Sequence, residues 1–267
     1  MPDMQRRSLI GAMATAAVAP AMAEGAVPDF NAPATNLLGM LKILGSTDPK
    51  QVTMSYAMGR VYACIDKQPP IPLFGTHSIS AARAQVRPDG TFLLRQHITG
   101  FRTTFGTETV IDQMKNPVTG DIVQLPLTDY GIGDSEYAFN GTFSLRAEGK
   151  RTQLNALGPR PWVIDNGAVG FSDDSVMPEP GPMHPKIDAV TRYAPIADIA
   201  DAKVTTATSW FNFSAVDPFR AYLKMRDPGF QLWHVAGRKV FEVSKMPGFI
   251  AQVAKERFPK LFDLPAF

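Results

Sequence analysis

Glycine and proline interrupt this chain so often that they divide it into many short segments. The sequence has 21 glycines and 23 prolines among 267 residues, together about a sixth of the chain and above average use. These residue types mark turns, and the segments between them are mostly too short for long helices. No tandem repeat and no linker divides the chain after residue 24. The pattern predicts a single domain built largely from short strands.

The clearest strand lies between Thr53 and Ile65. Large residues at even positions, such as Tyr56, Arg60 and Tyr62, alternate there with small residues at odd positions. Successive side chains of a strand point to opposite faces, so the two sets are expected on opposite faces. Other strands, including hairpins, are expected at 73–83, 91–101, 108–115, 121–125, 139–145, 153–157, 161–164, 168–171, 204–213, 230–235 and 238–243.

Helices are expected in only three places. Apolar spacing indicates helices at 36–44 and 249–258, and a third is expected to begin at Asp217 and Pro218. The stretch 172–200, rich in proline and aspartate, is expected to be a long loop. Many short strands with few helices predict a mainly β fold. We expect an antiparallel, lipocalin-like barrel with a few peripheral helices and an internal cavity; the alternative is a β-sandwich.

The first 23 residues have the form of an export signal. Arg6 and Arg7 precede Ser-Leu-Ile, an alanine-rich apolar stretch and the small-x-small site Ala21-Met22-Ala23. Adjacent arginines in this setting indicate the twin-arginine (Tat) route, whose translocase is then a transient partner. The apolar stretch is too short to span a bilayer. We expect 1–23 to be a signal peptide and 24–267 to be a periplasmic domain without stable membrane insertion.

Charge and motifs argue against several function classes. The formal net charge is +2 and no basic cluster occurs, so nucleic-acid binding is not expected. Cys64 is the single cysteine, which excludes an intramolecular disulfide. The four histidines form no local zinc motif, although a site assembled from distant strands stays open. Neither a G-x-S-x-G elbow nor a glycine-rich nucleotide loop is present, and no cofactor is expected.

Several short runs are informative as a set. They are Met58-Gly59-Arg60-Val61-Tyr62, Pro72-Leu73-Phe74-Gly75, Asn116-Pro117-Val118-Thr119-Gly120-Asp121, Lys224-Met225-Arg226-Asp227-Pro228-Gly229, Trp233-His234 and Gly237-Arg238-Lys239. Together they resemble the bacterial and fungal family called domain of unknown function 1838 (DUF1838). The resemblance covers roughly residues 35 to 262 and implies a single domain. Because the activity of that family is generally unassigned, it implies no catalytic residue.

The candidate site is a constellation on strands expected to be neighbours. A buried Arg60 would need an anionic or carbonyl partner, because an unpaired buried charge is costly. It would polarise a substrate carbonyl or phenolate while His97 or Asp112 moves a proton. The alternatives are that Arg60 forms a structural ion pair with Asp112 or Glu108, and that the other residues belong to the core. The substrate-binding candidates are Tyr56, Tyr62, Trp210, Trp233 and His234.

These features predict a periplasmic, cofactor-independent enzyme of the lyase, isomerase or dehydratase type. Its substrate would be a hydrophobic aromatic, terpenoid or steroid-like small molecule, in keeping with the 10% of aromatic residues. One alternative is a non-catalytic periplasmic protein that binds a similar ligand, and another is a structural or interaction module of the envelope. Ionisable groups in a cavity favour the enzyme, an apolar cavity favours the binding protein, and a filled interior favours the module.

Overall fold

The computed structural model describes residues 27–138, 142–147, 150–155, 162–177 and 186–267, so the expected signal peptide lies outside the described residues. Within them, eleven strands form one antiparallel sheet, and β4 (Gln113–Lys115) and β5 (Ile122–Gln124) form a separate hairpin. The strand order is β8 (Lys150–Asn155), β7 (Thr142–Ala147), β6 (Thr128–Tyr137), β3 (Phe92–Thr103), β2 (Ile71–Val86), β1 (Thr53–Ile65), β13 (Gly229–Val240), β12 (Trp210–Pro218), β11 (Lys186–Pro195), β10 (Ala168–Met177) and β9 (Trp162–Asp165).

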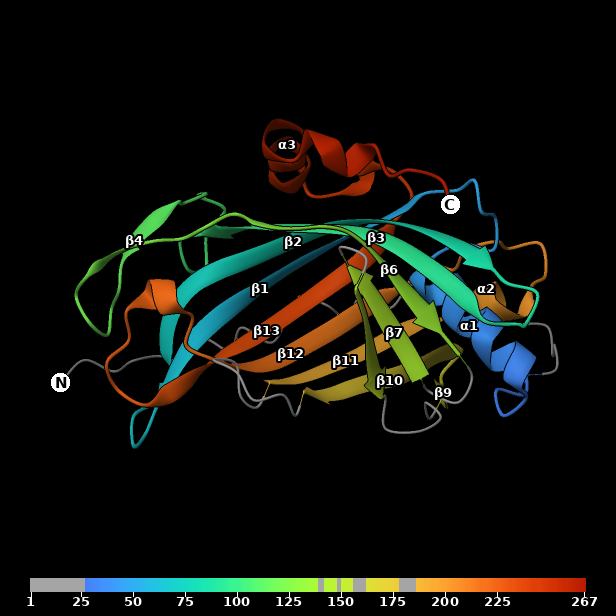
Figure 1. Ribbon diagram of the computed structural model, residues 1–267, viewed down its shortest axis with the longest axis horizontal. Coiled ribbons are helices and arrows are strands. Elements are labelled where there is room, and N and C mark those ends of the chain that lie inside the picture. The colour runs from blue at the N-terminus through green and yellow to red at the C-terminus, as the bar shows by residue number, and fades with distance from the viewer. Residues whose placement is uncertain (1–26, 139–141, 148–149, 156–161, 178–185) are drawn as a thin grey trace.

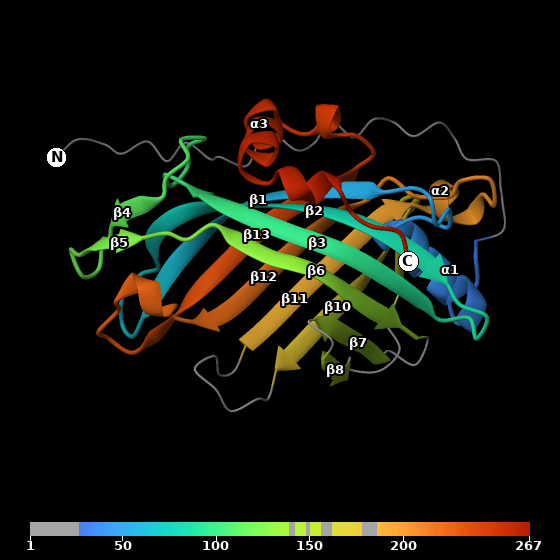
Figure 2. The ribbon, with the colours of Figure 1, turned by 45° about the horizontal axis from the view of Figure 1, so that its top comes forward.

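The sheet curls so that one of its faces is concave (Figures 1 and 2). Its two ends approach each other, because Cα atoms of β8 and β10 lie within 8 Å. No ladder of hydrogen bonds joins these ends in the described part of the chain. The prediction of a mainly β, antiparallel fold is therefore confirmed, and the described strands form a curled sheet in which no closed barrel is found.

Helix α1 (Pro33–Leu44) lies at one end of the concave side and packs between the two halves of the sheet (Figure 1). Its Met40 and Leu41 share an apolar cluster with Phe92 of β3 and Phe171 of β10, which are far apart along the sheet. The short α2 (Ile196–Ala200) adds Ile196 and Ile199 to the same cluster. The concave side is thereby filled at this end by side chains from both halves of the sheet.

Helix α3 (Gly248–Arg257) covers the opposite, convex face (Figures 1 and 2). Its Ile250 and Val253 pack on Ile79 of β2 and Phe101 of β3. Three single turns complete the helical structure: η1 (Ala221–Leu223), η2 (Val243–Lys245) and η3 (Pro259–Phe262). Within the described ranges, none of the helices has both the length and the apolar character needed to cross a membrane.

The period-two alternation of β1 identifies the concave face. Ala57, Val61 and Ala63 are almost fully buried, whereas Met58 and Arg60 on the other face are exposed. The small residues therefore face the interior, and the large residues face outward. Gly59 pairs with Thr76 of β2 and with Val235 of β13. Every second residue from Thr76 along β2 and from Val235 along β13 therefore also faces the concave side.

Several expected segments differ in the structure. Residues 178–185 of the expected loop 172–200 lie outside the described residues, and its other residues form the end of β10, all of β11 and α2. The expected hairpin 230–243 is the single strand β13. The helix expected from Asp217 is reduced to the single turn η1. Gly237 is not a turn residue, because β13 continues through it. A Cβ at this position would lie 2.2 Å from the Phe211 ring. The glycine makes room for that ring inside a continuous strand.

Candidate functional site

The concave face carries polar side chains towards both ends of β1. At the end near η1 lies a group that we call the Arg102 cluster, made up of Arg102, Asp217, Arg220, Tyr222, Gln231 and Trp233. At the α1 end is a cavity of about 40 Å³, the Lys239 pocket, whose polar lining is Thr53, Ser55, Ser80, Gln96, Arg192, Ser209 and Lys239. Lys239 pairs with Ser55 and Trp233 pairs with Val61. Six residues of β1 separate these pairs (61 − 55), which corresponds to about 20 Å.

Arg102 is the buried arginine of the concave face, with 8% of its surface exposed. Its Cζ lies 5.6 Å from the ring centroid of Phe74 and 5.2 Å from that of Trp233. The guanidinium donates to the backbone oxygen of Phe101 at 3.1 Å and to Thr128 Oγ1 at 3.2 Å. No carboxylate among the described residues forms an ion pair with it. Burial lowers the pKa of Arg102, yet arginine stays charged in proteins. An anionic group bound here would therefore be stabilised by the charge of Arg102.

Tyr222 is the hydroxyl partner of Arg102. The oxygen of Tyr222 lies near the guanidinium and favours its charged form. Burial raises the pKa of Tyr222, although the positive charges of Arg102 and Arg220 act in the opposite direction. The phenol is therefore neutral near pH 7, and its proton is available for a hydrogen bond to a ligand.

Three further members of the cluster carry polar atoms that have no hydrogen-bond partner among the described residues. These atoms are Asp217 Oδ1, Gln231 Nε2 and Oε1, and Trp233 Nε1. Gln231 has no exposed surface, and Asp217 is 3% exposed. Asp217 Oδ2 accepts from Arg220 at 3.1 Å. A buried polar atom left without a partner costs about 1–3 kcal/mol, so this arrangement favours an additional molecule, water or ligand, at the cluster.

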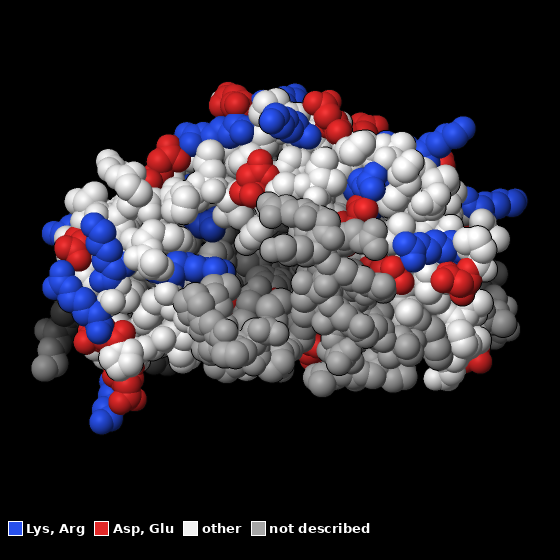
Figure 3. Space-filling model, in the orientation of Figure 1, with Lys and Arg blue, Asp and Glu red and all other residues white. Residues whose placement is uncertain are grey.

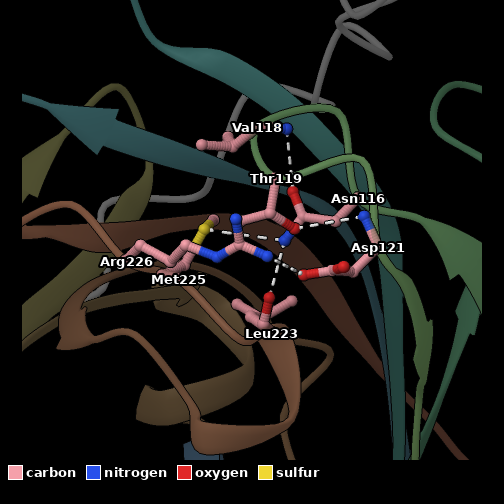
Figure 4. A network of polar contacts seen from close by, with 7 residues as sticks. All are labelled: Asn116, Val118, Thr119, Asp121, Leu223, Met225 and Arg226. Carbon is pink, nitrogen blue, oxygen red and sulfur yellow. Dashed lines mark hydrogen bonds and ion pairs between the residues drawn. The ribbon is translucent and has the colours of Figure 1, made fainter.

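A network around Asn116 holds the β4–β5 hairpin against η1 and the segment that follows it (Figure 4). Asn116 is completely buried. Its Nδ2 donates to the backbone oxygen of Leu223 at 2.7 Å, and its Oδ1 accepts from the backbone N–H of Val118 at 2.9 Å. Because Leu223 directly follows Tyr222, this network positions the Tyr222 backbone beside Arg102.

The same contact joins two of the runs noted in the sequence. Arg226 donates to Asp121 Oδ2 at 3.1 Å across the two segments (Figure 4). Gly120 closes the turn with a φ of 77°, a value that favours glycine. The run 116–121 and the run 224–229 are therefore in contact, although more than a hundred residues separate them.

The Lys239 pocket contains an ammonium group that also stabilises a helix end. Lys239 Nζ donates to the backbone oxygens of Lys42 and Gly45, at the end of α1, and to Thr206 Oγ1 at 2.8 Å. Burial lowers the pKa of Lys239 to about 7. Lys42 caps α2 in the same way through the oxygens of Asp198, Ile199 and Asp201. Positive charge at a helix C-terminus is favourable, so both lysines have a structural role.

The structure does not place Arg60 in the interior. Tyr56, Arg60 and Tyr62 share one face of β1, as predicted, but that face is the outer one. Arg60 is exposed, and its Cζ lies 5.6 Å from the Phe105 ring centroid. Tyr62 contacts the edge of the same ring, at 5.4 Å between centroids. The expectation of a buried Arg60, and its alternative of an ion pair with Asp112 or Glu108, are both wrong.

His97 and Asp112 are also held elsewhere. His97 pairs in register with Ala81 and hence with Met54, six residues from Arg60 (60 − 54), which corresponds to about 20 Å. Its Nε2 lies 2.7 Å from Asp129 Oδ1. Asp112 precedes β4 rather than lying on a strand beside β3, and it accepts from Arg257 of α3 at 2.7 Å. The three predicted catalytic residues are therefore not brought together.

Of the remaining predicted residues, only Trp233 lies on the concave face. Trp210 is on the outer face, 41% exposed, with its ring 6.4 Å from that of Tyr193. His234 is exposed on the outer face, and its Nδ1 lies 3.2 Å from Ser214 Oγ. The sequence contains one signal for the site residues that were missed. Gln231 lies two residues from Trp233, and Arg102 lies eight residues from Leu94, so each pair shares one face of its strand. That signal is usable only once the inner face is known.

No metal centre is apparent within the described ranges, where no group of three or more histidine, cysteine, aspartate or glutamate side chains is arranged to hold an ion. A scan against protein-family models finds no match to this chain, and a search among curated proteins finds no relative. Function is therefore inferred from the chemistry of the concave face.

Proposed function

We propose that this protein binds a small organic molecule on its concave face, through a carboxylate or carbonyl group held at the Arg102 cluster. The observation that carries the proposal is a buried guanidinium with no carboxylate partner among the described residues. Trp233 beside it is partly exposed and offers aromatic surface to a planar ligand body. A charge-assisted hydrogen bond from a buried arginine is about twice as strong as a neutral one.

The surface around the concavity agrees with such a ligand. The face drawn in Figure 3 is hollowed near its centre, and lysine or arginine side chains lie along the left margin of the hollow. Ser78, Ser80 and Gln96 on the concave strands are half-buried rather than sealed. The polar side chains favour a ligand with a polar end over the wholly hydrophobic one expected from the composition.

A second candidate is catalysis on the same ligand, as a cofactor-independent lyase or isomerase. The position of the Tyr222 hydroxyl near the buried Arg102 guanidinium favours it. A guanidinium and a phenol beside a carbonyl can stabilise a developing enolate while the Asp217 carboxylate takes the proton from the adjacent carbon, and the phenol can return a proton to that carbon. We expect the protein to accelerate deuterium exchange at the methylene of phenylpyruvate, measured by NMR. Tyr222→Phe is expected to abolish the acceleration, because it removes the proton donor. If the exchange rate were the same with and without protein, catalysis would be ruled out and only the binding function would remain.

The proposal also covers the compartment of the protein, its family and the closure of its sheet. The features of residues 1–23 support export by the twin-arginine route to the periplasm, and the short runs support membership of DUF1838. The approach of β8 to β10 supports a lipocalin-like barrel that closes around its ligand. Amide hydrogen exchange checks closure, because β8 and β9 are expected to become protected when ligand binds, and unchanged exchange there would argue for an open sheet.

Export is checked by the mass of the protein recovered from the periplasm. We expect it to begin at Glu24, because cleavage after Ala23 suits the small-x-small site. Replacing Arg6 and Arg7 together by lysine is expected to retain the protein in the cytoplasm. An uncleaved protein in the periplasmic fraction, or export unaffected by the double replacement, would contradict this assignment.

The Arg102 site is tested by calorimetry with two probes that differ in charge, benzoate and benzamide. We expect the protein to bind benzoate at least about tenfold more tightly, because the carboxylate pairs with Arg102. Arg102→Met is expected to remove this preference, and Arg238→Met, which alters an exposed arginine on the outer face of β13, is expected to keep it. If Arg102→Met binds benzoate as the unmodified protein does, the proposal is wrong. If Arg60→Met removes the preference instead, the site lies on the outer face.

A further inference from the structure

We infer that the ligand carries a hydroxyl group as well as an acidic group, and that Asp217, Gln231 and Trp233 recognise this hydroxyl. The inference rests on the proposed function and narrows its ligand to hydroxylated carboxylic acids. Asp217 of β12 and Gln231 of β13 are direct cross-strand neighbours. Trp233, two residues along β13, points to the same face.

The unpartnered atoms of these three residues match a hydroxyl group. Asp217 Oδ1 and Gln231 Oε1 are acceptors, and Gln231 Nε2 and Trp233 Nε1 are donors. A hydroxyl donates one hydrogen bond and accepts others, so it can satisfy donor and acceptor together. A carboxylate alone would meet only the donors and would be repelled by Asp217.

The hydroxyl subsite and the arginine are close enough for one small molecule. Trp233 connects them, because Arg102 lies over its ring and Gln231 is its neighbour on the same face of β13. Two residues along a strand span about 6.6 Å. The carboxylate and the para hydroxyl of 4-hydroxybenzoate are separated by a similar length. A ring that bears an acid at one end and a hydroxyl at the other therefore fits the arrangement.

Arg220 contributes to both parts of the cluster. It donates to Asp217 Oδ2, which leaves Oδ1 for the ligand. Its charge also acts on Arg102 and Tyr222. The segment that follows β12 therefore links the hydroxyl subsite to the anion subsite, and both are lined by residues from 217 to 233.

The test compares 4-hydroxybenzoate with benzoate by calorimetry. The unmodified protein is expected to bind 4-hydroxybenzoate at least about tenfold more tightly, the effect of one hydrogen bond that satisfies buried partners. Gln231→Leu is expected to remove that preference and to keep the affinity for benzoate. Its melting temperature without ligand is expected not to fall, because the amide it replaces has no partner among the described residues.

The outcomes separate this inference from the proposed function. If the unmodified protein binds both acids equally well, and benzoate binding still depends on Arg102, the hydroxyl subsite is overturned and the anion site stands. The unpartnered atoms then hold water only. A preference that survives Gln231→Leu in a folded protein also overturns it. If neither acid binds, or if Arg102→Met leaves both affinities unchanged, the proposed function fails and this inference fails with it.

Discussion

Replacing Asn116 by alanine is expected to lower the free energy of unfolding by about 2–4 kcal/mol, because one buried and one partly buried hydrogen bond are lost and their backbone partners keep no replacement. Those partners are the oxygen of Leu223 and the N–H of Val118. The same change releases the segment that carries Tyr222. Affinity for benzoate is therefore expected to fall as well, although Asn116 does not belong to the Arg102 cluster.

Urea unfolding at neutral pH measures the change in stability, and calorimetry measures the change in affinity. Thr119→Val is the matched control in the same turn, where the Thr119 hydroxyl accepts one longer bond of 3.3 Å from the backbone N–H of Asp121. We expect that variant to lose less than about 1 kcal/mol. If Asn116→Ala were no less stable than Thr119→Val, the network of Figure 4 would not hold the two segments together.

Acidification is expected to destabilise the protein through His77, whose ring lies on the convex face under α3. The ring stacks on Phe101 with centroids 5.0 Å apart and meets the edge of Phe249 at 5.2 Å. Burial, with a smaller contribution from the charge of Arg102, lowers the pKa of His77 from 6.5 to about 4. His77 is therefore neutral in the folded protein under most conditions.

The direction of the pH effect depends on these two pKa values. Between 4 and 6.5 the unfolded chain binds a proton that the folded chain does not, so stability is lost as the pH falls through this window. From about pH 7.5 to about pH 5 the loss due to His77 is about 2 kcal/mol. Above 6.5 both states are neutral, and His77 contributes no pH dependence.

The comparison of two variants isolates this contribution from that of the carboxylates. His77→Phe preserves the ring packing, and its free energy of unfolding is expected to fall by about 2 kcal/mol less over the same pH interval. His234→Phe, at an exposed histidine, is expected to keep the full pH dependence. Parallel pH profiles for His77→Phe and the unmodified protein would show that the folded state accepts a proton at this position.

Local sequence patterns predicted a helix or strand correctly where the residues on its two faces differ clearly in size or polarity. The alternation from Thr53 to Ile65 predicted β1, and the apolar spacings predicted α1 and α3 within a few residues. Such elements are readable because burial imposes a period on the sequence. Strand β11 escaped notice because Asp188 and Arg192 occupy its concave face. A strand that lines a polar interior has no apolar period.

The predicted site shows the same limit. The reasoning that a buried arginine needs an anionic partner is sound, but it was applied to Arg60, because large residues were expected to line the interior. In the structure the small face of β1 is the inner one. Phe74 of β2 and Trp233 of β13 flank Val61 on that face, so the small side chains of β1 leave room for the large ones of its neighbours.

By itself, the sequence determined the strand-rich character of this protein, its terminal helices and the turn at 116–121, because each depends on neighbouring residues and on local steric preferences. Only the tertiary structure decided which face of each strand is concave, and that residues 102, 217, 222 and 231 meet. Strand order and curvature depend on packing between segments far apart along the chain, and α1 takes part in that packing by contacting both halves of the sheet. The site arises from these long-range contacts, so no single segment encodes it.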